Sequence, residues 1–169
     1  MKYKSEKDMY PDVCQWLEAF LDDRFRQAEV DVHSLPHTPI SRFLSTYDRG
    51  SFPGEWVTWN IKVDVVGFVH HPNRSTDLVF VECKKNRLTL ADLSQLLGYS
   101  RIARPLYSFL ISPLGFSQAL ASLLQEYRRH DVLVYHSEAG KLPRQLIIAE
   151  WEMATRHLNR HTMIGGAGL

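Results

Sequence analysis

Several features that define other classes of protein are missing from this sequence. Its 169 residues contain two cysteines, Cys14 and Cys83, without CxxC spacing, which argues against a disulfide framework and a cysteine zinc site. No apolar run approaches the roughly 18–20 residues that span a membrane. The N-terminus, MKYKSEKDMYPD, is charged from the start, unlike a signal peptide. We therefore expect a cytoplasmic protein without a membrane partner.

The chain also lacks an excess of charge of either sign. A formal net charge of +1 counts against a protein that coats nucleic acid regardless of sequence. It counts little against a nuclease, because active-site carboxylates offset basic contact residues. The length suits one domain, and we expect residues 1–169 to form it. Its core should cover about 5–136, followed by a strand and helix extension at 144–160 and a frayed tail at 165–169.

Hydrophobic periodicity predicts an α/β fold. Pro11 is expected either to kink the first helix or to mark its true start. The polar stretch from His70 to Asp77 predicts a hairpin connection. A hairpin followed by strand–helix–strand units implies a mixed central sheet with helices on both faces. Helices are expected at 5–23, 40–47, 89–103, 117–129 and 150–160, and strands at 29–32, 56–69, 78–84, 106–112, 132–135 and 145–149.

The segment VFVECKK places a carboxylate beside an ammonium. Because successive side chains of a strand alternate between its faces, Glu82 and Lys84 share one face and Cys83 points to the other. Asp64 lies in the preceding apolar run, VDVV, where a charge is costly to bury unless it is paired or binds a metal. If the two strands pair as a hairpin, Asp64 comes beside Glu82.

This set of residues suits phosphodiester hydrolysis. Carboxylate oxygens hold Mg²⁺, which keeps several waters and accepts phosphate oxygens. The ion lowers the pKa of a bound water, and a lysine can orient that water or stabilise the charge that develops. The alternative is a structural salt bridge between Glu82 and Lys84. We favour the active site, with Mg²⁺ or Mn²⁺ as its cofactor, because the motif lies inside a strongly apolar strand.

Residues outside the motif are candidates for the same site. Glu6 falls on the apolar stripe of the first helix, although it also suits a first-turn acid that favours the helix dipole. Gln95 and Tyr99 share one face of the helix after the motif, where an amphipathic helix edge is the alternative. Lys85 and Arg101 flank the motif and either contact phosphates or are ordinary surface charges.

Asp64, then Glu82-Cys83-Lys84, then a helix beginning at Thr89 resemble the PD-(D/E)xK nuclease superfamily, which has a restriction-endonuclease-like fold with an αβββαβ core. The segment Gln95-Leu96-Leu97-Gly98-Tyr99 resembles the QxxxY motif of its RecB-like branch. Val63 stands where the superfamily motif has proline. The resemblance covers roughly residues 5–136.

The resemblance implies roles for individual residues. Asp64 and Glu82 would bind the metal, with the Cys83 backbone carbonyl as a further ligand. Lys84 would be the catalytic lysine, and Glu6 would match the acid that many members carry in the first helix. Gln95 and Tyr99 would contact metal-bound water, a phosphate or a base.

Three functions stay open after these observations, the third of them a metal-binding structural protein without a nucleic-acid partner. The first is a metal-dependent deoxyribonuclease, for which a homodimer is one option because cutting both strands of DNA needs two sites. The second is a catalytically silent module that retains the nuclease fold and binds nucleic acid or a protein. The presence of Asp64, Glu82 and Lys84 together favours the nuclease.

Overall fold

The first helix begins close to its predicted start. A computed structural model of the chain describes residues 3–72 and 76–166. The 3-10 turn η1 (Glu6–Asp8) begins with a capping box between Ser5 and Asp8, and helix α1 (Tyr10–Arg24) follows it. Pro11 lies in the first turn of α1, where the N–H that proline lacks has no helical partner in any case. Of its two predicted roles, Pro11 therefore marks the helix start.

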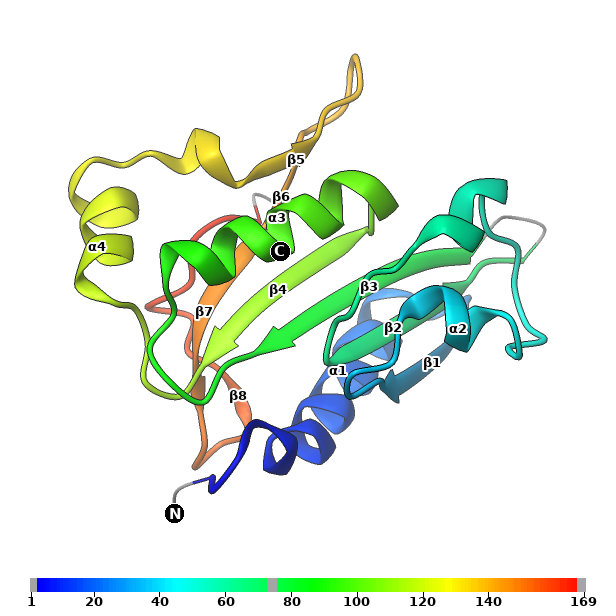
Figure 1. Cartoon of the computed structure of the whole chain (residues 1–169), viewed down its shortest axis with the longest axis horizontal. Helices are drawn as coiled ribbons and strands as arrows, with labels where there is room; N and C mark the ends of the chain where they lie inside the picture. Colours follow the sequence, from blue (N-terminus) through cyan, green and yellow to red (C-terminus); the bar gives the residue numbers. More distant parts are fainter. Residues whose placement is uncertain (1–2, 73–75, 167–169) are drawn as a thin grey trace.

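A six-stranded mixed sheet forms the centre of the molecule (Figure 1). Its strands, in spatial order, are β1 (Glu29–Ser34), β2 (Val65–His70), β3 (Thr76–Cys83), β4 (Tyr107–Ser112), β7 (Ile147–Glu152) and β8 (His157–Leu158). The first three are antiparallel, β3, β4 and β7 are parallel, and β8 is antiparallel to β7. The chain order α1, β1, β2, β3, α3, β4 confirms the predicted αβββαβ core and mixed sheet.

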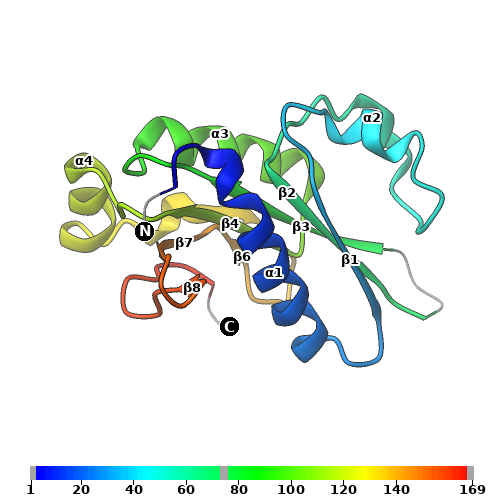
Figure 2. The same ribbon diagram turned by 90° about the horizontal axis from the view of Figure 1, so that it is seen from below.

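Helices cover both faces of the sheet, as predicted. On one face lie α2 (Ile40–Leu44), α3 (Leu90–Ala103) and α4 (Gln118–Ala121), and α1 packs on the other (Figures 1 and 2). Helix α3 begins after Thr89, as predicted, and Thr89 and Asp92 form a capping box there. Gly67 of β2 allows α1 to approach closely, because a Cβ at this position would lie 2.9 Å from a methyl group of Leu21.

The predicted strand over 56–69 is wrong in its first half. The 3-10 turn η2 (Gly54–Thr58) begins it, and sheet pairing starts at Val65. Residues 59–63, between this turn and β2, belong to no helix or strand. The Trp59 carbonyl accepts a hydrogen bond from the Ser41 N–H, and the Ile61 carbonyl accepts one from the Ile40 N–H. Alternate residues of this segment are buried, and this gave the strand-like pattern in the sequence. The segment pairs with no strand in the described part of the chain.

The predicted helix over 150–160 is also wrong. Strand β7 occupies its beginning, pairs in parallel with β4, and turns back into β8. Trp151 is buried in the core cluster beneath α1, so local helix propensity gives way to sheet pairing and packing. The predicted tail at 165–169 lies partly outside the described residues, and just before it Ile164 forms an isolated bridge with Ile148.

Two further elements differ from the prediction. The helix expected over 117–129 is reduced to α4 and a π-helical turn, η3 (Ser122–Glu126). The strand expected over 132–135 follows the turn η4 (His130–Leu133) as β5 (Val134–His136), which pairs with β6 (Arg144–Gln145) outside the central sheet. Residues 73–75 of the predicted hairpin tip lie outside the described residues. No helix in the described part of the chain is long and apolar enough to cross a membrane.

Candidate active site

Asp64 and Glu82 meet where the β2–β3 hairpin pairing ends. Val65 lies opposite Val81 and Val66 opposite Phe80, so the same register continued by one residue brings Asp64 opposite Glu82. The Cys83 backbone N–H donates to Asp64 Oδ2 at 2.8 Å, which ties the aspartate to the end of β3. The sequence prediction that pairing would place these carboxylates side by side agrees with this register.

Asp64 is held by hydrogen bonds on both carboxylate oxygens. Its Oδ1 accepts from the Tyr10 hydroxyl of α1 at 2.5 Å, and its Oδ2 accepts from Cys83 as above. Burial raises the pKa of the Asp64 carboxyl in spite of these two bonds, which favour the charged form. Sequence reasoning missed Tyr10, whose place in the apolar first turn of α1 gives no sign of a polar role.

Glu82 is the most deeply buried acid of the site, with 6% of its surface exposed. Its Oε1 accepts from Lys84 Nζ at 2.8 Å. Its Oε2 is buried and has no hydrogen-bond partner in the described part of the chain. Burial, and after it the charge of Asp64, raises the pKa of Glu82 to about 7. A buried carboxylate oxygen without a donor is costly, so Glu82 is suited to gain a cation or a proton at this atom.

Lys84 lies between two carboxylates. Besides its bond to Glu82, its Nζ is 3.9 Å from Oδ1 of Asp92 at the start of α3. Burial acts to lower the pKa of Lys84, but the hydrogen bond and the charge of Glu82 outweigh it and the pKa is raised, so the side chain stays an ammonium ion at neutral pH. Asp92 was not among the predicted site residues. The short connection between β3 and α3 was the sign that this residue lies near Lys84.

Glu6 lies at the same end of β3, in η1 rather than in the first α-helix. Its Oε1 accepts from the Lys85 backbone N–H at 3.2 Å, and the Lys85 ammonium donates to the Lys4 carbonyl at 2.8 Å. The structure therefore brings Glu6 next to the motif. Its carboxylate is engaged with the backbone just after Lys84.

The three predicted site residues of α3 lie outside the hydrogen-bonded centre of the site. Gln95 and Arg101 are exposed, and Tyr99 is half-buried and packs against the larger core cluster. No hydrogen bond or ion pair joins any of these three to Asp64, Glu82 or Lys84 within residues 3–72 and 76–166. Gln95 and Tyr99 do share a helix face with Asp92, three and seven residues before them. They stand beside the site, outside its hydrogen-bonded centre.

A divalent cation fits the donor set, given the orphaned Oε2 of Glu82. In an extended strand the N–H and C=O of one residue point to the same side, so the Cys83 carbonyl faces the side on which its N–H meets Asp64. Among the described residues, no group of three His, Cys, Asp or Glu side chains is placed to hold a metal. An ion here would therefore be held by two carboxylates, a carbonyl and waters, a set that suits Mg²⁺.

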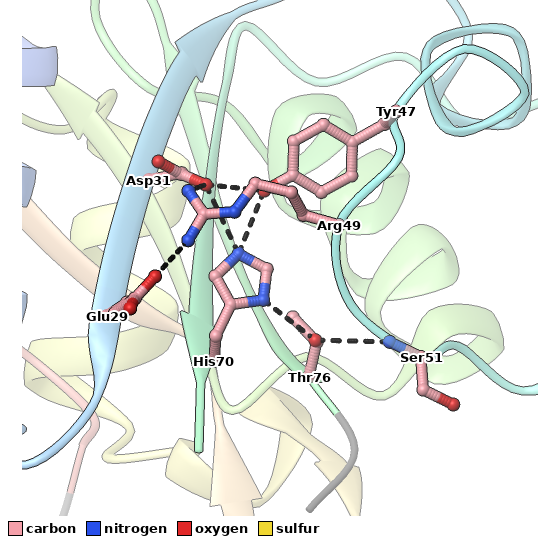
Figure 3. A network of polar contacts seen from close by, with 7 residues as sticks. All are labelled: Glu29, Asp31, Tyr47, Arg49, Ser51, His70 and Thr76. Carbon is pink, nitrogen blue, oxygen red and sulfur yellow. Dashed lines mark hydrogen bonds and ion pairs between the residues drawn. The ribbon is translucent and has the colours of Figure 1, made fainter. Parts of the chain in front are cut away.

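A second polar cluster lies at the other end of β2 (Figure 3). The Tyr47 hydroxyl donates to Asp31 Oδ2 at 2.7 Å, and Arg49 Nη1 forms an ion pair with the same oxygen at 2.5 Å. His70 Nε2 lies 2.8 Å from the Tyr47 oxygen, and His70 Nδ1 lies 3.0 Å from Thr76 Oγ1. Because the Tyr47 proton goes to Asp31, His70 donates from Nε2. Every contact in this cluster has a donor and an acceptor.

Comparison with known proteins adds no argument to these observations. No protein-family model and no curated protein matches the chain. A solved structure described as "MspJI Restriction Endonuclease in Complex with 27-mer Oligonucleotide" is similar over 85% of this chain and 26% of that chain, at 12% sequence identity and a TM-score of 0.39. The chain thus spans about a quarter of the length of its match. At this identity and TM-score the likeness carries no information about activity.

Proposed function

We propose that this protein is a divalent-metal-dependent nuclease of the PD-(D/E)xK type that hydrolyses phosphodiester bonds of DNA. One observation carries the proposal. The half-buried carboxylate of Asp64, the buried carboxylate of Glu82 and the ammonium of Lys84 converge at the end of one strand pair, and Glu82 keeps an oxygen without a partner among the described residues. Such a group is costly to the fold and suited to binding a cation, as expected of a functional site.

The residues divide the work as follows. Asp64, Glu82 and the Cys83 carbonyl hold Mg²⁺ or Mn²⁺, and Tyr10 fixes the orientation of Asp64. When bound, the metal lowers the pKa of a water and neutralises charge on the phosphate. Lys84, held by Glu82 and Asp92, places an ammonium next to the carboxylates, where it orients the attacking water or stabilises the developing charge.

The remaining candidates surround this centre. Glu6 adds a third acid at the end of β3, where its negative charge acts on Asp64 and Glu82. Lys85 and Arg101 supply exposed cations for phosphates of the substrate. Gln95 and Tyr99 extend the site along the α3 face that begins with Asp92. They contact the substrate or its waters.

A second candidate function is a catalytically silent module that binds nucleic acid. It is favoured by the absence of a cluster of three acidic, His or Cys ligands from the described part of the chain. In that case the Glu82–Lys84 pair serves the fold alone.

Cleavage assays separate the two. Plasmid and single-stranded oligonucleotides are incubated with the protein and Mg²⁺ or Mn²⁺, with EDTA as the metal-free control. The nuclease predicts metal-dependent products that Asp64→Ala abolishes. Equal products from wild type and Asp64→Ala, or oligonucleotide binding without any cleavage, would leave the silent module as the better account.

A further inference from the structure

A pocket lies beside the candidate active site, at the end of the sheet where three parallel strands finish. Lys85 and Asn86 follow β3, Pro113 and Leu114 follow β4, and Met153 follows β7. In Figure 1 the arrowheads of β3 and β4 point to this end. The carboxyl ends of parallel strands are where α/β proteins most often bind ligands. The pocket has a volume of about 410 Å³, within the range for small-molecule sites.

Tyr3 and Lys4 of the N-terminal segment also line the pocket. The Tyr3 hydroxyl donates to Asp12 of α1 at 2.8 Å and accepts from Trp151 Nε1 at 3.1 Å. The Lys4 carbonyl accepts from Lys85 Nζ at 2.8 Å. These contacts hold Tyr3 and Lys4 against the ends of β3 and β7, so both line a fixed wall of the pocket.

The lining combines cations with apolar surface. Lys4 and Lys85 contribute two ammonium groups, and no carboxylate lines the pocket. Within residues 3–72 and 76–166 neither lysine forms an ion pair shorter than 4.0 Å. The apolar part of the lining consists of Leu114, which is 43% exposed, with Pro113 and Met153. A ligand with one anionic group and one flat apolar part satisfies both halves.

We propose that this pocket binds the nucleotide next to the bond that is cut, with its phosphate on Lys4 and Lys85 and its base against Leu114 and Met153. The inference rests on the proposed nuclease function. Lys85, which lines the pocket, directly follows Lys84, so a nucleic-acid strand with one phosphate at Lys84 would have its next nucleotide near the pocket. The volume of about 410 Å³ is of the size of one nucleotide. The pocket therefore selects an unpaired nucleotide, as in a single strand or at an opened end.

Binding tests the pocket without cleavage. Fluorescence anisotropy with a fluorescein-labelled oligothymidylate in EDTA measures Kd for wild type and variants. Leu114→Asp, which places a negative charge in the pocket, should raise Kd about tenfold. Lys4→Ala should lower the slope of log Kd against log salt by about 0.7, the value for one phosphate contact on a single strand. The matched controls Leu142→Asp and Lys141→Ala, both exposed near the β5–β6 hairpin, should leave Kd and slope unchanged.

A cross-linking readout covers the case in which Leu114→Asp fails to fold. Oligothymidylate carrying 5-iododeoxyuridine, irradiated with the wild-type protein, should give adducts on Tyr3 or Met153 in peptide mass spectra. Adducts confined to other parts of the molecule, or pocket variants with the Kd and salt slope of wild type, would overturn the proposal.

The outcome also separates this proposal from the nuclease itself. In Mg²⁺, Leu114→Asp should raise KM for a single strand about tenfold and change kcat less than about threefold. Cleavage by wild type with no effect of Leu114→Asp on KM or Kd overturns the pocket and leaves the nuclease. Pocket-dependent oligonucleotide binding without any cleavage supports the pocket as a nucleotide site and overturns the nuclease.

Discussion

The two ends of strand β2 carry partly buried polar clusters that differ in how completely their carboxylates are hydrogen-bonded. At its carboxyl end Asp31 receives the Tyr47 hydroxyl, the Arg49 guanidinium and His70 (Figure 3). Burial acts to raise the pKa of Asp31, but Tyr47 and Arg49 outweigh it and the pKa is lowered. Side chains of the protein thus provide hydrogen-bond donors and a positive charge for the Asp31 carboxylate.

At the amino end of β2 the balance is reversed. Burial and the charge of Asp64 raise the pKa of Glu82 even though Lys84 donates to it, and one Glu82 oxygen keeps no partner in the described residues. Both clusters are rich in acids and hydrogen bonds, so counting such groups does not tell them apart. The completeness of the partner set does. A satisfied carboxylate stabilises the fold, and an unsatisfied one is the better candidate for binding a ligand.

The largest effect expected from this contrast is on activity. Glu82→Gln keeps the shape of the side chain and removes its charge, so metal-dependent cleavage should fall by about a hundredfold or more. Asp31→Asn, the same change in the satisfied cluster, should keep cleavage within about threefold of wild type. Initial rates on a single-stranded and a plasmid substrate measure both. A comparable loss in both variants would mean that the contrast between the two ends does not locate the active site.

The same two clusters show which parts of the site could be predicted from the sequence. Strand alternation is a local property, so VFVECKK was enough to place Glu82 and Lys84 on one face. The position of Asp64 followed from the hairpin register. The Asp31 cluster was not predicted, because its members come from four separate segments that only the tertiary fold brings together.

Errors in the predicted fold have the same origin. Trp59, Ile61 and Val63 alternate as a strand does, but their neighbours in space are α2 and the chain after β1. The sequence from Glu150 onward predicts a helix, but in the structure its first residues belong to β7, which pairs with β4. Partners distant in the sequence decide such segments, and a single sequence does not name them.

The next largest effect concerns stability as a function of pH. The pKa of Glu82 is raised from near 4.5 to about 7, so the folded state binds this proton more tightly than the unfolded state. Its effect on stability is therefore neutral below about pH 4.5 and becomes increasingly unfavourable as the pH rises to 7, by up to about 3 kcal/mol. In EDTA, Glu82→Gln should be more stable than wild type at pH 8 and similar to it at pH 4, by urea unfolding.

Asp31 should behave with the opposite sign. Its lowered pKa means that the ionised carboxylate stabilises the fold above its ordinary pKa and that this contribution is lost on acidification. Asp31→Asn should cost about 1–3 kcal/mol at pH 8, because it weakens charge-assisted hydrogen bonds, and less at pH 3. Parallel pH profiles for the two variants would contradict the contrast between the clusters.

Metal should reverse the penalty at Glu82. At a concentration of one hundred times Kd, an ion that binds the folded state stabilises it by about 2.7 kcal/mol. Mg²⁺ or Mn²⁺ should therefore raise the Tm of wild type at pH 8 and leave the Tm of Glu82→Gln nearly unchanged, with Asp31→Asn responding as wild type does. The shift should weaken below pH 7, where the ion competes with a proton on Glu82. Calorimetric scans with and without metal at pH 6 and pH 8 measure it.

The smallest effect compares two tyrosines with the same task. Tyr10 donates to Asp64 and Tyr47 donates to Asp31, and each change to phenylalanine removes one hydroxyl while it keeps the ring in place. Tyr47→Phe should lose about 1 kcal/mol of stability and keep the affinity for metal. Tyr10→Phe frees Asp64 to rotate, so it should bind Mn²⁺ about tenfold more weakly, as typical for loss of a group that orients a ligand. Titration calorimetry with Mn²⁺ measures both affinities. If Tyr10→Phe binds Mn²⁺ as wild type does, Tyr10 serves the fold alone, and the hydroxyls at the two ends of β2 are equivalent.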